Sequence, residues 1–275
     1  MAASCQAETF YVNNLFGNDS NDGLAATDVG AATGPVQTLR RAVRLLSPGD
    51  VLSLADTGTP YAGGFALHGV QHSGTPDFPV IIDGNNAVVS GATPIDPAAW
   101  QHVTYDIWRI TPQRKGWYQL LLNGAVIPEV AVAADAQELP ALEFGSWCVF
   151  RGVIYYRPQQ YTEPQRENLM LATDQTGLTL LDVENVLVRN LTFQHFRQDG
   201  IHLHDLCRHV VFVNVRAVEN GRAGIVVGGT SEAFLSQVTV TGNRVHSLLI
   251  EDLGSVDTES VDLNPEPTVT PLPQP

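Results

Sequence analysis

The sequence predicts an all-β solenoid, and three observations lead to that fold class. First, short apolar runs recur between residues 178 and 253, at intervals of 23, 24 and 23 residues, starting at Leu178, Ile201, Ile225 and Leu248. Second, each repeat alternates apolar and polar residues, which is the periodicity of strands. Third, Asn190, Asn214 and Gln237 recur in phase, and asparagine tolerates the backbone of a sharp corner. Three strands and one corner per repeat predict a right-handed parallel β-helix.

The composition limits what the chain binds. Its 275 residues include 29 acidic and 15 basic side chains, for a formal net charge of −14. This balance argues against nucleic acid and anionic membranes as partners, and against a polyanionic substrate unless a local arginine cluster overrides it. No apolar run approaches the length of a membrane span. The cysteines, Cys5, Cys148 and Cys207, are odd in number and lack the spacing of a metal site.

The first seven residues carry a weak export signal. They are small and look like the end of a secretory leader, although they are too few to form a whole signal peptide. A lipid-anchored Cys5 is a second interpretation, and an ordinary chain terminus is a third. Either of the first two indicates an extracytoplasmic or secreted protein.

The N-terminal part, residues 9–91, is predicted to form a cap and the first coils. A strand at 10–12 is followed by a polar turn at 18–23, which mimics a calcium loop but lacks the closing glutamate. Residues 39–46 predict an amphipathic helix, with an apolar face formed by Leu39, Ala42, Val43 and Leu46. A solenoid exposes its apolar interior at each end, so we expect this helix to cover the first coil. Its arginines, Arg40, Arg41 and Arg44, are predicted to be a solvated face.

Residues 92–170 interrupt the repeats and concentrate tryptophan and tyrosine. Two apolar runs at 147–150 and 153–156 meet at Arg151-Gly152, which predicts a hairpin. We therefore expect a small antiparallel β insertion. Trp147 and Tyr156 are candidates for stacking on sugar rings if they are exposed. The alternative is that these aromatic side chains form the core of the insertion itself.

The regular coils occupy residues 171–263, and a proline-rich tail follows at 264–275. The tail is poor in apolar residues and is predicted to be extended or disordered. It begins within the fourth coil, so the C-terminal end of the solenoid needs a cover. One interpretation is that the tail covers this end. A second is that another chain covers it, which would mean self-association. A third is that the solenoid is a shortened form.

Motifs in the N-terminal part resemble a known superfamily. They are Tyr11-Val12, Gly17-Asn18-Asp19, Asp22-Gly23, residues 34–39, Pro48-Gly49-Asp50, residues 73–76 and Ile82-Asp83-Gly84. Together they resemble the entry segment of the pectate-lyase-like β-helix superfamily, whose members include secreted carbohydrate-active proteins. With the coils, the resemblance covers most of residues 9–91 and 171–263. It implies a fold and a glycan as partner, and it does not specify a reaction.

Three acidic residues end successive strands of the coils. Asp182, Asp205 and Asp252 fall at equivalent positions, with Gly229 between the last two. Neighbouring coils lie about 4.8 Å apart, so Asp205 and Asp252 are expected roughly 9.6 Å apart. Carboxylates at such spacings suit glycoside hydrolysis. The layout resembles the aspartates of polygalacturonases, although the flanking signatures of that family are missing. The alternative is that these aspartates are turn formers.

Other polar residues lie near this column. His202 and His204 are predicted to point outward, where they could move protons or orient a carboxylate, and Glu251 is in line with His204. A lyase would need a basic residue, for which Arg189, Arg197 and Arg222 are candidates. The lyase interpretation also implies calcium, with Asp199 as a candidate ligand.

Three functions remain open at the level of the sequence. The first is an extracytoplasmic carbohydrate-active enzyme that cleaves a polysaccharide by carboxylate-mediated glycoside hydrolysis. The second is a polysaccharide lyase that uses an arginine base and calcium. In addition to their candidate catalytic groups, both enzymes would bind substrate through Arg189, Arg222, Trp147 and Tyr156. The third is a non-catalytic, glycan-binding surface module, because a fold does not determine a function.

Overall fold

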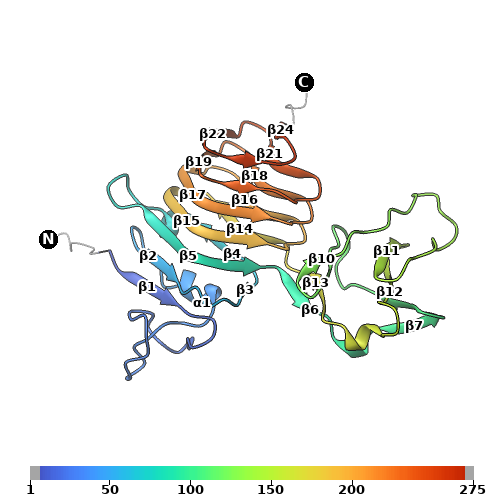
Figure 1. Cartoon of the computed structure of the whole chain (residues 1–275). Helices are drawn as coiled ribbons and strands as arrows, with labels where there is room; N and C mark the ends of the chain where they lie inside the picture. The colour runs from blue at the N-terminus through green and yellow to red at the C-terminus, as the bar shows by residue number, and fades with distance from the viewer. Residues whose placement is uncertain (1–6, 270–275) are drawn as a thin grey trace. The chain divides into compact units, whose positions relative to one another are not determined.

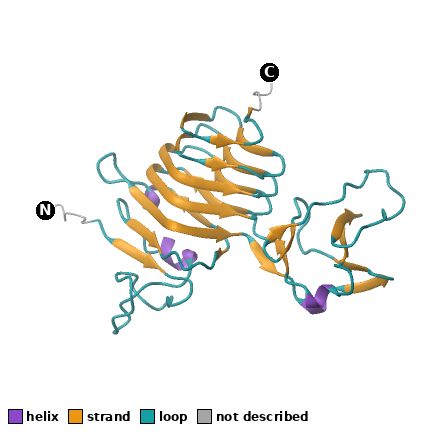
Figure 2. Cartoon of the chain, viewed as in Figure 1, coloured by secondary structure: helices purple, strands orange, loops and turns teal. Residues whose placement is uncertain are grey.

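The computed structural model describes residues 7–269 of the chain. Within this range the chain forms two compact units. Unit 1 contains the described residues up to Gly91 together with those from Asp174 onward, and unit 2 is Ala92–Thr173. Strands dominate both units, and the helical segments are few and short (Figure 2). The prediction of an all-β protein is therefore confirmed. The predicted leader with Cys5 lies outside the described residues, except for Ala7.

Unit 1 is a parallel β-helix whose larger sheet, sheet 1, pairs its strands in parallel (Figure 1). The stacked strands of sheet 1 are β1 (Thr9–Val12), β2 (Val51–Leu54), β5 (Val80–Ser90), β15 (Glu184–Gln194), β17 (Arg208–Val218), β19 (Glu232–Ser236) and β22 (Ser255–Glu259). Three short strands join them, namely β3 (Tyr61–Ala62), β20 (Thr239–Val240) and β23 (Asp262–Leu263). In β15 and β17, two predicted runs merge into one bent strand.

The second sheet of unit 1, sheet 2, contains one strand from each coil. Its strands are β4 (Phe65–His68), β14 (Thr176–Leu181), β16 (Asp199–Leu203), β18 (Ala223–Val227), β21 (His246–Ile250) and β24 (Thr268–Val269). The predicted register is confirmed, because Leu178, Ile201, Ile225 and Leu248 pair in succession. All four side chains are buried in the solenoid core.

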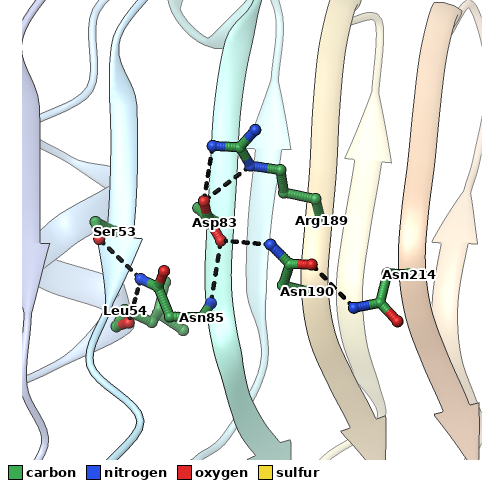
Figure 3. Close-up of polar contacts among 7 residues, drawn as sticks. All are labelled: Ser53, Leu54, Asp83, Asn85, Arg189, Asn190 and Asn214. Atoms are coloured by element: carbon green, nitrogen blue, oxygen red, sulfur yellow. Dashed lines mark hydrogen bonds and ion pairs between the residues drawn. The ribbon is translucent and has the colours of Figure 1, made fainter.

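The corner of each coil in sheet 1 is held by a ladder of polar side chains (Figure 3). Asn190 and Asn214 adopt left-handed backbone angles, with φ of 51° and 52°, as does Gln237 at 55°. The Asn214 amide donates to Asn190 Oδ1 over 2.9 Å, and the Asn190 amide donates to Asp83 Oδ1 over 3.1 Å. The predicted corner asparagines are therefore confirmed, and their amides link successive coils.

Strands β16 and β18 of sheet 2 require glycine at their second position. A Cβ on Gly200 would lie 2.7 Å from the Asn220 amide nitrogen, and one on Gly224 would collide with Val240. These contacts show that both glycines face the tightly packed interior, so that the residue before each of them faces outward.

Helix α1 (Leu39–Val43) lies at the N-terminal end of the solenoid (Figure 1). Thr38 caps it by accepting the Arg41 amide over 3.1 Å, and Asp19 in turn holds Thr38. Leu39, Ala42 and Val43 face the core, as the predicted amphipathic pattern requires. The helix is shorter than the predicted 39–46, because the chain turns after Val43 while Leu46 stays in the core. The short helix η1 (Val70–His72) follows β4.

Unit 2 consists of two antiparallel sheets with a core of their own. The first sheet contains β10 (Ala125–Val126), β9 (Leu120–Leu122), β13 (Leu169–Ala172) and β6 (Ala92–Pro94). The second contains β11 (Ser146–Phe150), β12 (Val153–Arg157), β8 (Ile107–Ile110) and β7 (Gln101–Thr104). Two short helices complete the unit, η2 (Pro97–Ala99) and η3 (Pro164–Arg166). The predicted hairpin across Arg151-Gly152 is β11–β12.

The tail joins the solenoid as far as it is described. Leu249 and Ile250 of β21 pair with Thr268 and Val269 of β24. Thus the described part of the tail adds a strand to sheet 2, which is the extended alternative of the prediction and not the disordered one. The rest of the predicted tail, residues 270–275, lies outside the described residues.

Candidate functional site

Sheet 2 presents its outward-facing side chains in columns, one residue from each coil. Side chains alternate between the two faces of a strand, so the residues beside the buried core positions point outward. The first column contains Thr176, Asp199, Ala223 and His246. The second contains Thr179, His202, Val226 and Leu249. The third, taken from the same register, contains His68, Leu181, His204, Gly228 and Glu251.

Asp199 is a buried carboxylate on this outward face. Its side chain has no exposed surface, and the Arg222 guanidinium donates to both oxygens, from Nε over 2.8 Å and from Nη2 over 2.6 Å. His202 Nδ1 lies 3.4 Å from Asp199 Oδ2. A buried charge is stable only when it is paired in this way. Asp199 therefore lies between a cation from the next coil and an imidazole of its own strand.

The contacts of Asp199 keep it ionised. Burial by itself raises the pKa of this carboxyl, but hydrogen bonds from His202 and Arg222 outweigh burial and hold the pKa below its ordinary value. The Asp199 carboxylate accepts a hydrogen bond from Nδ1–H of His202. This contact orients the imidazole and leaves its Nε2 for other contacts. In many hydrolases a carboxylate orients a catalytic histidine in the same way.

His202 and His204 stack on each other. Their ring centroids are 3.8 Å apart and the planes meet at 13°. Burial lowers the pKa of His204, and the neighbouring His202 lowers it further, although Asp199 and Glu251 oppose this effect. His204 is therefore neutral near pH 7, in the form that accepts a proton.

A hollow of about 690 Å³ opens beside His204. Ala66 of β4 and Thr179 of β14 line it, and its remaining lining comes from β4, η1, α1, the start of β14 and the residues that flank these elements. Those residues include Arg40, Val43, Arg44, Gly64, Phe65, His68, Gln71, His72, Asp174, Gln175 and Thr176. The volume lies in the range of small-molecule binding sites.

Glu251 approaches the same column from the C-terminal side. Its Oε2 lies 3.9 Å from the point that a Cβ on Gly228 would occupy. Gly228 has no side chain, which leaves room for the Glu251 carboxylate beside it. His204 and Glu251 are two coils apart, roughly 9.6 Å along the solenoid axis.

The aspartate column predicted to be catalytic lies in the turns that follow the strands of sheet 2. Asp205 Oδ1 accepts the amides of Leu206 and Thr230 over 2.8 Å each, and the Thr230 hydroxyl over 3.1 Å. These bonds lower the pKa of Asp205, the Thr230 amide contributing most. A Cβ on Gly229 would collide with this carboxylate. Asp182 and Asp252 are exposed and adopt left-handed backbone angles. All three positions thus have the geometry of turn residues.

Four other candidates belong to sheet 1 or are buried. Arg189 belongs to sheet 1, where its guanidinium pairs with Asp83 over 2.8 Å. Trp147 and Tyr156 are buried in the core of unit 2, with relative exposures of 1% and 0%. Of the two interpretations, the core of the insertion is therefore confirmed for these side chains, and the candidate role in stacking on sugar rings is wrong. The fourth, Arg197, is also buried.

Asp199 is not arranged as a calcium ligand. Both of its oxygens accept from Arg222, and a guanidinium in that position repels a second cation. In the described part of the chain, no group of three or more His, Cys, Asp or Glu side chains is arranged to hold a metal ion. Likewise, no helix among the described residues is long and apolar enough to cross a membrane.

The sequence reading missed the residues that line the hollow from outside the coils. Arg40 and Arg44, predicted to face solvent, both line it, as do His68 and Asp174. The sequence does place Arg40 and Arg44 four residues apart, which puts both on one face of the predicted helix. Nothing in the sequence shows that this face borders a hollow.

Comparisons with known proteins agree with this fold. Residues 160–260 match a family model described as a right handed beta helix region. A solved chain described as a glycoside hydrolase has a TM-score of 0.64 and 13% identity, over 89% of this chain and 67% of that one. The complex structure of XylC with xylose gives a TM-score of 0.48 and 13% identity, over 92% and 64%. A GH136 lacto-N-biosidase from Eubacterium ramulus gives 0.30 and 15%, over 89% and 34%.

No curated protein sequence matches the chain. The likeness to the first solved structure is one of fold, since the identity is 13%. Together with the matched family model and the parallel coils, it shows that the chain has a right-handed parallel β-helix fold.

Proposed function

We propose that the protein is a carbohydrate-active enzyme that binds a glycan on the outward face of sheet 2 and hydrolyses a glycosidic bond beside His204. One observation carries the proposal. A fully buried carboxylate, Asp199, orients His202 on a surface where the fold does not require a charge. His202 in turn stacks on His204, which borders the hollow. Perturbed, paired ionisable groups beside a hollow are typical of catalytic sites.

In this proposal His204 is the general base. Its neutral imidazole takes a proton from a water molecule, whose oxygen attacks the anomeric carbon. Glu251 is the general acid, which gives a proton to the departing glycosidic oxygen. Their coils lie roughly 9.6 Å apart, and the Glu251 carboxylate extends back toward Gly228 on the coil between them; inverting enzymes hold their two carboxyl groups about 6.5–9.5 Å apart. His202 and Asp199 are positioning residues that hold the His204 ring.

The chain shares its fold with a structure described as a glycoside hydrolase, and this likeness supports hydrolysis as the proposed reaction. The aspartates of the turns are not needed in this mechanism, because the turn amides already bind Asp205. A glycan substrate also favours an extracytoplasmic location for the protein.

A second reaction, β-elimination by a polysaccharide lyase, is favoured by the cationic lining. Arg40 and Arg44 border the hollow that contains the neutral His204. A lyase needs a base together with a cation that neutralises the carboxylate of an acidic sugar. In this version His204 takes the place of the arginine base predicted from the sequence.

The test is an assay of glycan cleavage on xylan, polygalacturonate and a neutral galactan. The variants are His204→Gln and Glu251→Gln, and the matched control is His209→Gln, an exposed histidine of sheet 1. New reducing ends that disappear in both site variants, but not in the control, support hydrolysis. Products that absorb ultraviolet light identify the lyase. Binding without any product supports the non-catalytic module and contradicts both enzymes.

A further inference from the structure

The hollow on sheet 2 ends at the N-terminal cap. Arg40 and Val43 of α1, with Arg44 directly after it, form part of its wall, and α1 lies at the N-terminal end of the solenoid (Figure 1). His72 fixes this wall, because its Nδ1 accepts the His68 amide over 3.1 Å and its Nε2 then donates to the Val43 carbonyl over 3.1 Å. The His72 ring is buried. The helix is thus tied to the end of β4.

The hollow also has a limit toward the C-terminal coils. The outward positions that follow His202 in its column are Val226 and Leu249, which are buried at 0% and 5% exposure. With Ala223 they form a separate apolar cluster. Arg222 extends from its own coil back to Asp199. The hollow is therefore confined to the coils of β4, β14 and β16, which span roughly 9.6 Å along the axis.

We infer that this site accepts the end of a glycan chain and not its interior. An internal segment of a polymer must leave a site in two directions, and α1 closes one of them. A chain end can lie between α1 and His204 while the rest of the chain leaves past Gly228, beside the carboxylate of Glu251. The inference rests on the proposed function, and it defines the enzyme as one that releases short fragments from a chain terminus.

The chemistry of the wall suits a terminus. Arg40, Arg44 and His68 offer donors, and Asp174 offers a carboxylate acceptor. A terminal sugar has a hydroxyl group that is absent from an internal sugar, where the same oxygen is part of a glycosidic bond. Hydrogen bonds from charged side chains to such a hydroxyl favour the terminus over the interior.

The test measures products and binding on whichever of xylan, polygalacturonate and galactan the protein uses. Each glycan is supplied as equal masses of long and short chains. We expect a short product of uniform size from the first time point. We also expect binding sites in titration to increase with the number of chain ends, and thus to be more numerous for short chains. The double variant Arg40→Ala/Arg44→Ala should bind short chains at least tenfold more weakly than the wild type, whereas Arg216→Ala on sheet 1 should not differ.

A broad mixture of intermediate lengths at early times would overturn the chain-end inference and leave the proposed hydrolase standing. Equal numbers of sites per mass of long and short chains would also overturn it, even in a protein that does not cleave. If none of the three glycans is bound, both the inference and the proposed function fail.

Discussion

His202 Nδ1 lies 3.4 Å from Oδ2 of Asp199, a carboxylate with no exposed surface on the outer side of the solenoid. This pair connects the cation of Arg222 to the stacked rings of His202 and His204. Two of the four groups come from β16, Arg222 directly precedes β18, and His204 directly follows β16. The site is therefore assembled from residues of two neighbouring coils. Changes in the Asp199–His202 pair should affect both stability and activity.

Replacing Asp199 by Asn should weaken the protein and its activity together. The change removes the charge that pairs with Arg222 and orients His202. Lost hydrogen bonds to a charged group cost about 1.5–3 kcal/mol of unfolding free energy. Urea unfolding measures this loss, with Asp257→Asn as the control, because that aspartate is exposed on the last strand of sheet 1. Equal stability of the two variants would contradict the role given to Asp199.

The pH dependence of Asp199 follows from the direction of its shift. Its pKa is lower in the folded protein than the ordinary value of 3.8. The stability that it contributes is thus present above that value, and it is lost as the pH falls through the lower, folded-state pKa. Comparing wild type with Asp199→Asn by thermal unfolding between neutral and strongly acidic pH checks this. If the stability difference between wild type and Asp199→Asn grew toward low pH, it would contradict the lowered pKa of Asp199.

Activity should depend on the protonation of His204. Burial and His202 lower its pKa from the ordinary 6.5, which extends the pH range in which the base is neutral. The acidic limb of the kcat/KM profile should therefore have its midpoint below pH 6.5, and His204→Gln should lower kcat by about 10²–10⁴-fold. A midpoint above that value, or full activity of His204→Gln, would exclude His204 as the base.

Replacing Asp205 by Ala should lower stability and leave kcat unchanged. Three donors lose their acceptor in the turn around Gly229. The lowered pKa of Asp205 means that its contribution is present above the ordinary carboxyl pKa and lost as the pH falls through the folded-state value. Melting temperature and kcat, measured on the same preparation, separate a turn role from a catalytic one.

Replacing Asn190 by Ala should destabilise the ladder of polar side chains at the corners of sheet 1. Asn190→Ala removes the bonds to Asp83 and Asn214 and places a Cβ residue without a polar group at φ of 51°. The expected loss is about 1 kcal/mol for each net hydrogen bond. Arg216→Ala on the same sheet serves as the control. A loss no larger than that of the control would mean that the ladder does not stabilise the coils.

The fold was predictable because the repeat fixes the register by itself. Leu178, Ile201 and Ile225 must all be inward, and a shift by one residue would expose every one of them. The asparagine corners follow from backbone sterics that are local to each residue. The merging of two runs across Asn190 in β15 was not predictable, because one bent strand and two short strands have the same pattern.

The site was predictable only in part. His202, His204 and Glu251 were identified because strand alternation determines which side chains point outward. The partner of Asp199 was missed, since the pairing depends on Arg222 extending back by one coil. Trp147 and Tyr156 show the same limit, because an aromatic residue has the same sequence signal in a core as on a surface.

One measurement tests the central claim most directly, namely the rate at which reducing ends form on a cleaved glycan with His204→Gln and with Asp205→Ala. The account predicts that His204→Gln loses nearly all activity and that Asp205→Ala, assayed below its melting temperature, keeps it. The opposite result, activity retained in His204→Gln and lost in Asp205→Ala, would move the chemistry to the aspartates of the turns and contradict the site described on sheet 2.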